Sequence, residues 1–324
     1  MEISPMHSCS ICANTKLALM YEHVKDHYKI VRQEYQFWRC ENCASAILQP
    51  FPSPEEISSF YPPNYVFKVN ERKKGARWLL DRLQWRLFYR PIYDQKVKSL
   101  METTRLRSGR ILDVGCGSGI LLHLLANEGF DVAGVEVSAE DVRYAEETFG
   151  IKVVPGTLKQ AAFPDASFDA VTLYNVLEHV PDPFETLCEV ARILKPGGWV
   201  ALDVPLIDSR QSDFFKDHWG QITEAPRHLC IPSSKGVRTI LKRAGFSQVK
   251  TSNVSVLAVA AFIALSLYPA SAMIVASEGT AGFVRRILGG VIAAISIPIA
   301  FAERAISACG DRPCGAMLFF GRKE

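Results

Sequence analysis

The stretch RILDVGCGSGI (110–120) decides the fold of this chain of 324 residues. Its short apolar run, ILDV, is followed by Gly115, Gly117 and Gly119 and then by the helical pattern ILLHLLANEG. Glycines let the backbone turn tightly between a strand and a helix, and they let a ligand approach the helix N-terminus without Cβ clashes. The stretch therefore predicts a strand, a ligand-binding loop and a helix.

Outward from this loop, residues 109–253 alternate strand-like and helix-like segments, which predicts a parallel sheet with crossover helices. The segment AMLFFGRK (316–323) predicts one more strand. The chain then divides into a module with paired cysteines (1–50), a linker with a basic amphipathic lid helix (51–108), a sheet domain (109–253 plus 314–324) and an apolar helical insert (254–313).

The composition is that of a globular protein, with 22% charged and 48% apolar residues. A net charge of +3 is too small to indicate nucleic-acid binding by itself. The N-terminal MEISPMHSCSICANTK has no apolar core of a signal peptide, so we expect a cytoplasmic location. Disulfides are rare there, and the cysteines are therefore expected to be thiols or metal ligands.

The residues around the glycines indicate which cofactor the loop holds. Glu136 ends the next strand, where a carboxylate can accept both hydroxyls of a ribose. Ile120 stands where a dinucleotide-binding motif needs its third glycine. Asp113 would repel a pyrophosphate but suits the ammonium of a methionine moiety. The pattern favours S-adenosylmethionine (SAM) over a dinucleotide.

Four motifs occur in an order that resembles class I SAM-dependent methyltransferases: ILDVGCGSG, Glu136, FDAVTLYNVLEHVPDP and LKPGGWVALDVP. The resemblance implies an α/β fold with a Rossmann-like sheet of seven strands, parallel except for a reversed last strand. It also implies the residues that bind SAM: Asp113, Gly115, Cys116, Gly117 and Gly119 at the methionine part, Glu136 at the ribose, Thr157 and Leu158 at the adenine, and Asn175 beside the sulfonium.

Polar residues that follow the fourth and fifth predicted strands are candidates for the acceptor site, because open α/β sheets bind ligands at the carboxyl ends of their strands. Glu178, His179 and His228 are the candidate catalytic residues, and Glu224 and Arg227 lie near them in sequence. His179 has the alternative of packing at a helix start. The segment NVLEHVPDP also resembles ubiquinone-pathway O-methyltransferases, which have a metal-associated Glu where Asn175 stands, so a catalytic metal is not expected.

Four cysteines form two CxxC pairs separated by 27 residues: Cys9, Cys12, Cys40 and Cys43. Two such pairs supply the four thiolates of a closed, structural Zn²⁺ site. The alternative is a small module that folds with four reduced thiols and no metal. The module, followed by PFPSPEEISSFYPPNY, resembles a group of methyltransferases in surface-sugar pathways, which implies a glycan or lipid-linked glycan acceptor.

An apolar block lies before the last predicted strand. Residues 254–277 contain no charged residue and are long enough to span a bilayer, whereas the second run, 287–302, is shorter. A spanning hairpin would put Arg285 and Arg286 outside, against the positive-inside tendency. Contact with one leaflet, a cover over a lipid-shaped pocket and plain packing remain open. The basic, aromatic stretch 72–98 suits an interfacial helix or, alternatively, a solvated lid.

These patterns predict a methyltransferase that transfers a methyl group from SAM to an oxygen, or to a carbon, of a sugar, lipid-linked glycan or prenyl-type lipid. The predicted location is cytoplasmic, with peripheral contact at the cytosolic face of a membrane. Two alternatives remain. An RNA methyltransferase is permitted by the basic stretch but disfavoured by LYNVLE, which replaces the NPPY-type turn of base methyltransferases. A SAM-binding scaffold without catalysis is the other.

Overall fold

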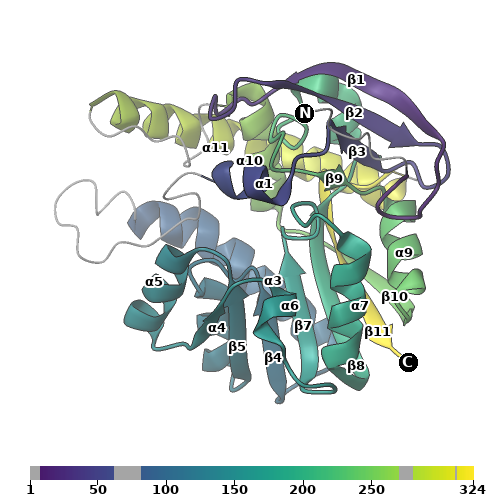
Figure 1. The fold of residues 1–324 in the computed structure, drawn as a ribbon. Coiled ribbons are helices and arrows are strands. Elements are labelled where there is room, and N and C mark those ends of the chain that lie inside the picture. The colour runs from purple at the N-terminus through teal and green to yellow at the C-terminus, as the bar shows by residue number, and fades with distance from the viewer. Residues whose placement is uncertain (1–7, 62–81, 270–279, 311) are drawn as a thin grey trace.

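The computed structural model describes residues 8–61, 82–269, 280–310 and 312–324 (Figure 1). Its larger sheet has seven strands in the order β10-β11-β8-β7-β4-β5-β6. Their bounds are β4 Arg110–Val114, β5 Asp131–Glu136, β6 Val153–Pro155, β7 Phe168–Tyr174, β8 Leu194–Pro205, β10 Phe246–Asn253 and β11 Ala316–Lys323. Strand β11 pairs antiparallel with both β8 and β10, whereas the pairs from β8 to β6 are parallel. The predicted sheet with a reversed last strand is confirmed.

Helices cover both faces of this sheet. Their bounds in the described residues are α1 Pro54–Ser59, η1 Trp85–Tyr89, α3 Arg90–Thr104, α4 Ile120–Asn127, α5 Ala139–Phe149, α6 Leu158–Ala161, α7 Pro183–Ile193, α8 Arg210–Phe215, η2 Lys216–His218, α9 Ser234–Arg243, α10 Val256–Leu267 and α11 Thr280–Cys309. Alternate strand residues enter different cores: Leu112 and Val171 pack with α7 and α9, whereas Ile111 and Ala170 pack with α3, α4 and α10. This two-residue period arises because successive strand side chains point to opposite faces.

The N-terminal module is a second, antiparallel sheet, which lies at the top of Figure 1. It consists of β1 Leu17–Lys25, β2 Glu34–Cys40, β3 Ala46–Gln49 and β9 Cys230–Ile231. The fourth strand comes from a distant part of the chain, since Ala46 pairs with Ile231 and Ile47 with Cys230. The division of the chain into four regions stays a prediction, but the first and third of those regions share this sheet.

The apolar block forms helices between the last two strands, as the pattern predicted. The lengths differ from expectation. The first run gives α10, of 12 residues, and residues 270–279 lie outside the described part of the chain. The second run lies within α11, which has 30 residues because Gly289, Gly290 and Pro298 do not end it. By length and composition alone, Ile287–Cys309 is long and apolar enough to cross a membrane.

The basic stretch 72–98 is described from Arg82 onward, so its residues 72–81 lie outside the structure's described part. Its remainder is helical through η1 and α3. Val97 and Leu100 of α3 are buried against the large sheet, which ties this helix to the sheet domain.

Candidate functional site

The loop between β4 and α4 has the backbone that its glycines predicted. Gly115, Gly117 and Gly119 have φ values of 65°, 50° and 76°, a region that favours glycine. A Cβ on Gly115 would lie 2.7 Å from Val176 Cγ2, and one on Gly119 would lie 2.8 Å from the Cβ of Ala145. The glycines thus serve both the turn and the close packing beneath it.

Asp113 is the penultimate residue of β4, and it is buried, with 4% of it exposed. Thr172 donates its hydroxyl to Asp113 Oδ1 at 2.5 Å. Burial raises the pKa of Asp113 to about 7, although Thr172 and the Lys96 ammonium act in the opposite direction. A cation bound beside Asp113 would stabilise its ionised form, which suits the ammonium of a methionine moiety.

Glu136 reaches the glycine loop from the end of β5. Gly117 N–H donates to Glu136 Oε2 at 2.8 Å, and Ser138 N–H donates to Oε1 at 2.9 Å. Burial raises the pKa of Glu136, and these two hydrogen bonds oppose the shift. An ionised carboxylate offers about four lone-pair sites. Each oxygen therefore keeps one for a further donor, and the arrangement fits a ribose with two hydroxyls.

The other residues implied for SAM lie around this loop. Thr157 is the N-cap of α6, where its side chain accepts from Gln160 N–H, and Leu158 is buried. Asn175 is exposed just after β7, with φ of 55°. Cys116 is buried, which raises the pKa of its thiol, and a Cβ on Gly134 would come within 2.7 Å of its Sγ. The roles of these residues in cofactor binding stay predictions.

Three polar residues near Asp113 were not foreseen: Lys96 and Asp203 are buried, and Tyr174 is half-buried. Lys96 Nζ lies 2.8 Å from Asp203 Oδ2, and it also lies 4.9 Å from the ring centre of Tyr174. Burial alone would lower the pKa of Lys96, but the attraction of Asp203, Tyr93 and Asp113 together raises it. Tyr174 Oη and Asp203 Oδ1 are buried without a hydrogen-bond partner among the described residues. Lys96 gave no signal in the sequence, since it is one of many cations in a basic stretch.

The three candidate catalytic residues do come together. Ligand atoms of Glu178, His179 and His228 all lie within 4.8 Å of one another, and the two imidazole rings are 4.6 Å apart. The expectation that no catalytic metal is bound rested on Asn175 alone. It did not foresee that His228 would join Glu178 and His179, which makes this group a possible cation site by proximity.

Burial gives these three residues different protonation states. It lowers the pKa of His179 and of His228 to about 3, so both imidazoles are neutral at physiological pH. It raises the pKa of Glu178 to about 8. The Glu178 Oε2 atom is buried, and no residue in the described ranges forms a hydrogen bond to it. A base whose pKa lies near the working pH is suited to proton transfer, and Glu178 meets that condition best.

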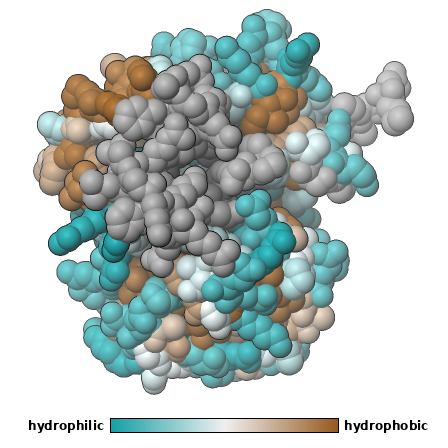
Figure 2. All heavy atoms as spheres, turned by 90° about the vertical axis from the view of Figure 1, so that its left-hand side faces the viewer, coloured by the Kyte–Doolittle hydropathy of each residue, from teal (hydrophilic) through white to brown (hydrophobic). Residues whose placement is uncertain are grey.

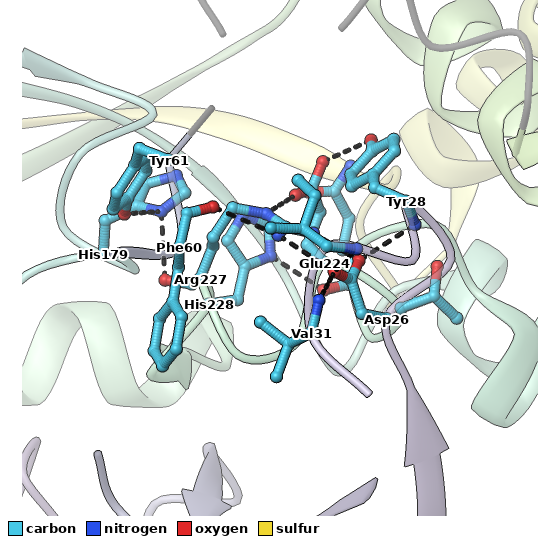
Figure 3. Close-up of polar contacts among 12 residues, drawn as sticks. Asp26, Tyr28, Val31, Phe60, Tyr61, His179, Glu224, Arg227 and His228 are labelled. Atoms are coloured by element: carbon cyan, nitrogen blue, oxygen red, sulfur yellow. Dashed lines mark hydrogen bonds and ion pairs between the residues drawn. The ribbon is translucent and has the colours of Figure 1, made fainter. Parts of the chain in front are cut away.

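Glu224 and Arg227, which neighbour His228 in sequence, serve a buried ion network (Figure 3). Arg227 Nη2 lies 2.7 Å from Asp26 Oδ1, and Arg227 Nε lies 2.9 Å from Glu224 Oε2. Tyr28 donates its hydroxyl to Glu224 Oε1 at 2.5 Å. Asp26 and Tyr28 follow β1, so the network fastens the N-terminal sheet to the loop that carries His228.

The same loop fixes the two histidines. His179 Nδ1 lies 3.1 Å from the carbonyl oxygen of Arg227 and 3.2 Å from Tyr61 Oη, as Figure 3 shows. His228 Nδ1 lies 2.7 Å from the carbonyl oxygen of Gln221. These bonds orient both rings, and Tyr61 brings the segment after α1 to the site.

The four N-terminal cysteines form one cluster with two matching turns. In the first turn Ala13 N–H donates to Cys9 O, and in the second Ala44 N–H donates to Cys40 O. Ala13 and Ala44 each have φ of 61°. The two CxxC segments therefore have the same local geometry and present their thiols to a common centre.

The distances within this cluster fit a tetrahedral metal. The Sγ atoms of Cys9 and Cys43 are 3.6 Å apart, and those of Cys12 and Cys40 are 3.5 Å apart. A Zn–S length of about 2.3 Å places two sulfurs of a tetrahedron about 3.8 Å apart. The hydrogen bond between Cys9 and Cys43 lowers the pKa of Cys43 and raises that of Cys9, so within this pair the Cys43 thiolate forms first. Metal ligation requires thiolates.

The cluster packs against α9 of the large domain. Ser233, the N-cap of α9, donates its hydroxyl to the carbonyl oxygen of Cys43, and Arg243 donates to that of Ile11. A Cβ on Gly236 would come within 2.2 Å of Ser45 Oγ. The cysteine module is therefore seated closely on this helix.

Comparisons with known proteins identify the family of this chain. The profile of a family described as "Methyltransferase domain" matches residues 85–251. The ubiquinone biosynthesis O-methyltransferase of Thiobacillus denitrificans is 38% identical over 102 residues, which are 29% of this chain and 44% of that protein. The corresponding protein of Paraburkholderia phymatum is 35% identical over 123 residues, 35% of this chain and 52% of its own length.

These matches span about half the length of the curated relatives or less. Among solved structures, a SAM-dependent methyltransferase from Archaeoglobus fulgidus has 18% sequence identity to this chain. The match covers 77% of this chain and 100% of that one, with a TM-score of 0.47.

Proposed function

The chain belongs to the class I SAM-dependent methyltransferase family, and from this premise we propose that it transfers a methyl group from SAM to a small-molecule acceptor. The proposed acceptor atom is an oxygen, with carbon as the second choice. Asp113 would hold the ammonium of SAM, Glu136 its ribose hydroxyls, and the backbone from Gly115 to Gly119 would leave room for the methionine part.

Bound SAM supplies a methyl group on a sulfonium, which is already a good electrophile. The protein then has to orient the acceptor in line with that methyl group, and well-oriented reactants account for much of the acceleration in such reactions. Asn175 and the pair His179 and His228 would line the acceptor side. Their neutral rings offer hydrogen bonds without adding charge beside a sulfonium.

A hydroxyl acceptor must lose its proton during transfer, and we assign that proton to Glu178 Oε2. The single observation that carries this assignment is the buried, unpartnered Oε2 of a carboxyl whose pKa is about 8. Ionised Glu178 would take the proton from the acceptor hydroxyl as the oxygen–methyl bond forms. General bases of this kind contribute roughly 10²- to 10⁴-fold to a rate.

The acceptor class that we propose is a sugar, a lipid-linked glycan or a prenyl-type lipid. The partial match to proteins named for ubiquinone biosynthesis supports the prenyl-type lipid. The cysteine module supports the glycans, by the resemblance stated above. We also propose a cytoplasmic location. The proposed metal is a structural Zn²⁺ on Cys9, Cys12, Cys40 and Cys43, because four thiolate ligands leave no coordination position open for substrate.

The test uses SAM with an isotopically labelled methyl group and a lysate of source cells that lack the gene. Wild-type protein should label one product, and Glu178→Gln should lower the initial rate about 100-fold or more. Glu185→Gln, an exposed change on α7, is the control and should leave the rate unchanged. Ribonuclease-sensitive label would favour an RNA acceptor. The absence of label despite SAM binding would favour a non-catalytic scaffold.

A further inference from the structure

Helix α11 exposes a continuous row of aliphatic side chains. Between 43% and 63% of each residue is exposed, and we call the row the aliphatic stripe: Val284, Ile287, Leu288, Val291, Ile295 and Ile299. Residues three, four or seven apart share one face of a helix, so these six side chains lie along one line. No charged residue occurs from Ile287 to Ala302. A surface helix of a soluble protein normally has polar residues on its outward face.

The opposite face of α11 is held by the protein. Gly289, Ser296, Ala300 and Glu303 are buried. Glu303 accepts a hydrogen bond from Gln211 Nε2 at 2.8 Å and another from Gly315 N–H at 3.2 Å. A helix fixed in this way along one side cannot be surrounded by lipid, so its apolar outer face calls for a partner that covers one side only.

A basic segment lies next to these helices. Arg82, Arg86 and Arg90 are exposed, and Leu83 and Leu87 between them are 50% and 53% exposed. This is the alternation of cations and leucines that suits an interface between water and anionic lipid.

Helix α10 joins the basic segment to α11, because α3, α10 and α11 contribute to one hydrophobic core. In Figure 1 the N-terminal ends of α3 and α11 extend toward the same side of the molecule. Figure 2, which views that side, shows an extended hydrophobic area at its upper left, with smaller hydrophobic patches elsewhere on this face.

We propose that the aliphatic stripe, together with Arg82, Arg86 and Arg90, is a docking surface for an anionic lipid bilayer, on which α11 lies in the plane of the interface. The stripe lies along a projecting helix, and a convex surface suits a fluid, planar partner. Arg90 also pairs with Asp94 on its own helix. Pairing with the stripe of a second copy would bring the basic segments of both copies close together, and such like charges repel. An anionic headgroup layer satisfies both the apolar row and these cations.

The docking surface and the proposed acceptor site are connected to the same edge of the large sheet. Strand β10 ends at Asn253, which pairs with Met317, and Met317 pairs with Val204 near the end of β8. Helices α10 and α11 therefore leave the sheet at its carboxyl edge, the edge that also holds Glu178. An acceptor dissolved in the bilayer would reach the site from that edge. Binding to lipid does not itself rest on the proposed methyl transfer.

The experiment is co-sedimentation of the full chain with phosphatidylcholine vesicles, with and without phosphatidylglycerol. Wild-type protein should sediment with the anionic vesicles. Ile295→Glu should lower its partition coefficient about tenfold or more, because it removes an aliphatic contact and adds an anion. Leu19→Glu, a similar change at an exposed leucine of β1, is the matched control and should bind as wild type does. Arg86→Gln should weaken binding to anionic vesicles.

Circular dichroism keeps the test independent of folding, and Val291→Ser provides a milder variant at the same stripe. The proposal is overturned if wild-type protein stays in the supernatant with both vesicle types, or if Ile295→Glu and Leu19→Glu bind equally well. It is also overturned if Ile295→Glu instead converts a dimer in solution to a monomer, since the stripe would then be a contact between copies. Methyl transfer enters none of these readouts, so failure here is distinct from failure of the proposed enzyme activity.

Discussion

Three single carboxylates lie at or just beyond the ends of the parallel strands in the candidate site. Asp113, Glu136 and Glu178 are all buried, yet each has a different set of partners. Asp113 accepts from a hydroxyl, Glu136 accepts from two backbone N–H groups, and Glu178 keeps one oxygen without a partner in the described chain. These different partners are the basis on which we propose ligand binding for Asp113 and Glu136 and proton transfer for Glu178.

Glu178 should make stability depend on pH. Its pKa rises from 4.5 to about 8 on folding. Between these values the unfolded chain releases the proton while the folded chain keeps it, so the contribution present below pH 4.5 is lost as pH rises to 8. Glu178→Gln should therefore be more stable than wild type near pH 8, by on the order of a few kcal/mol. Urea unfolding at several pH values measures this. A difference that does not shrink toward pH 4.5 would contradict it.

Glu136→Ala should abolish measurable SAM binding, because the ribose loses its acceptor and Gly117 N–H loses its partner. Isothermal titration calorimetry is the measurement. Glu140→Ala, an exposed change at the start of α5, is the control and should bind SAM as wild type does. If Glu136→Ala still bound SAM with micromolar affinity, Glu136 would not be the residue that holds the ribose.

At the scale of elements, the two CxxC turns repeat the same backbone conformation, and the sequence predicts this repeat only in part. The spacing of the cysteines predicted a common cluster. It did not predict that Ala13 and Ala44 would both adopt the left-handed conformation, which glycine adopts at lower cost. The arrangement of the four thiols therefore comes from the matching turns as much as from the spacing of the cysteines.

Removal of zinc should loosen the N-terminal module. We expect about one zinc per chain by mass spectrometry of the intact metal-loaded protein, and we expect chelation to lower the melting temperature because metal binding contributes to folding. Cys9→Ser should have the same effect, whereas Cys188→Ser, at an exposed cysteine of α7, should not. A second bound metal that survives Cys9→Ser would point to Glu178, His179 and His228.

Across the whole molecule, the buried ion network ties the N-terminal sheet to the loop that carries His228. Arg227→Ala would leave the carboxylates of Asp26 and Glu224 buried without their guanidinium, at a cost of about 3–5 kcal/mol. Chemical denaturation checks the value. Arg192→Ala breaks ion pairs that are mostly exposed and should cost at most about 1 kcal/mol. Equal costs for the two variants would show that the network does not hold the module.

The sequence predicted the parts of the molecule that local pattern determines. The glycine loop, Glu136 and the order of strands and helices follow from periodicity and from turn residues near each other in the chain. Lys96 beside Asp203, and Asp26 beside Arg227, could not be predicted, since 201 positions separate the latter pair. Such pairs form only when the completed sheets bring distant segments together, and no short pattern encodes them.

The shared strand β9 has a consequence for synthesis on the ribosome. Strands β1 to β3 emerge early, but the outer edge of β3 has no partner until Ile231 has been translated. At typical translation speeds that delay lasts on the order of ten seconds. During this interval a bare strand edge is open to pairing with other chains. Early binding of a metal ion by the two cysteine turns would stabilise the nascent module before β9 has been synthesised.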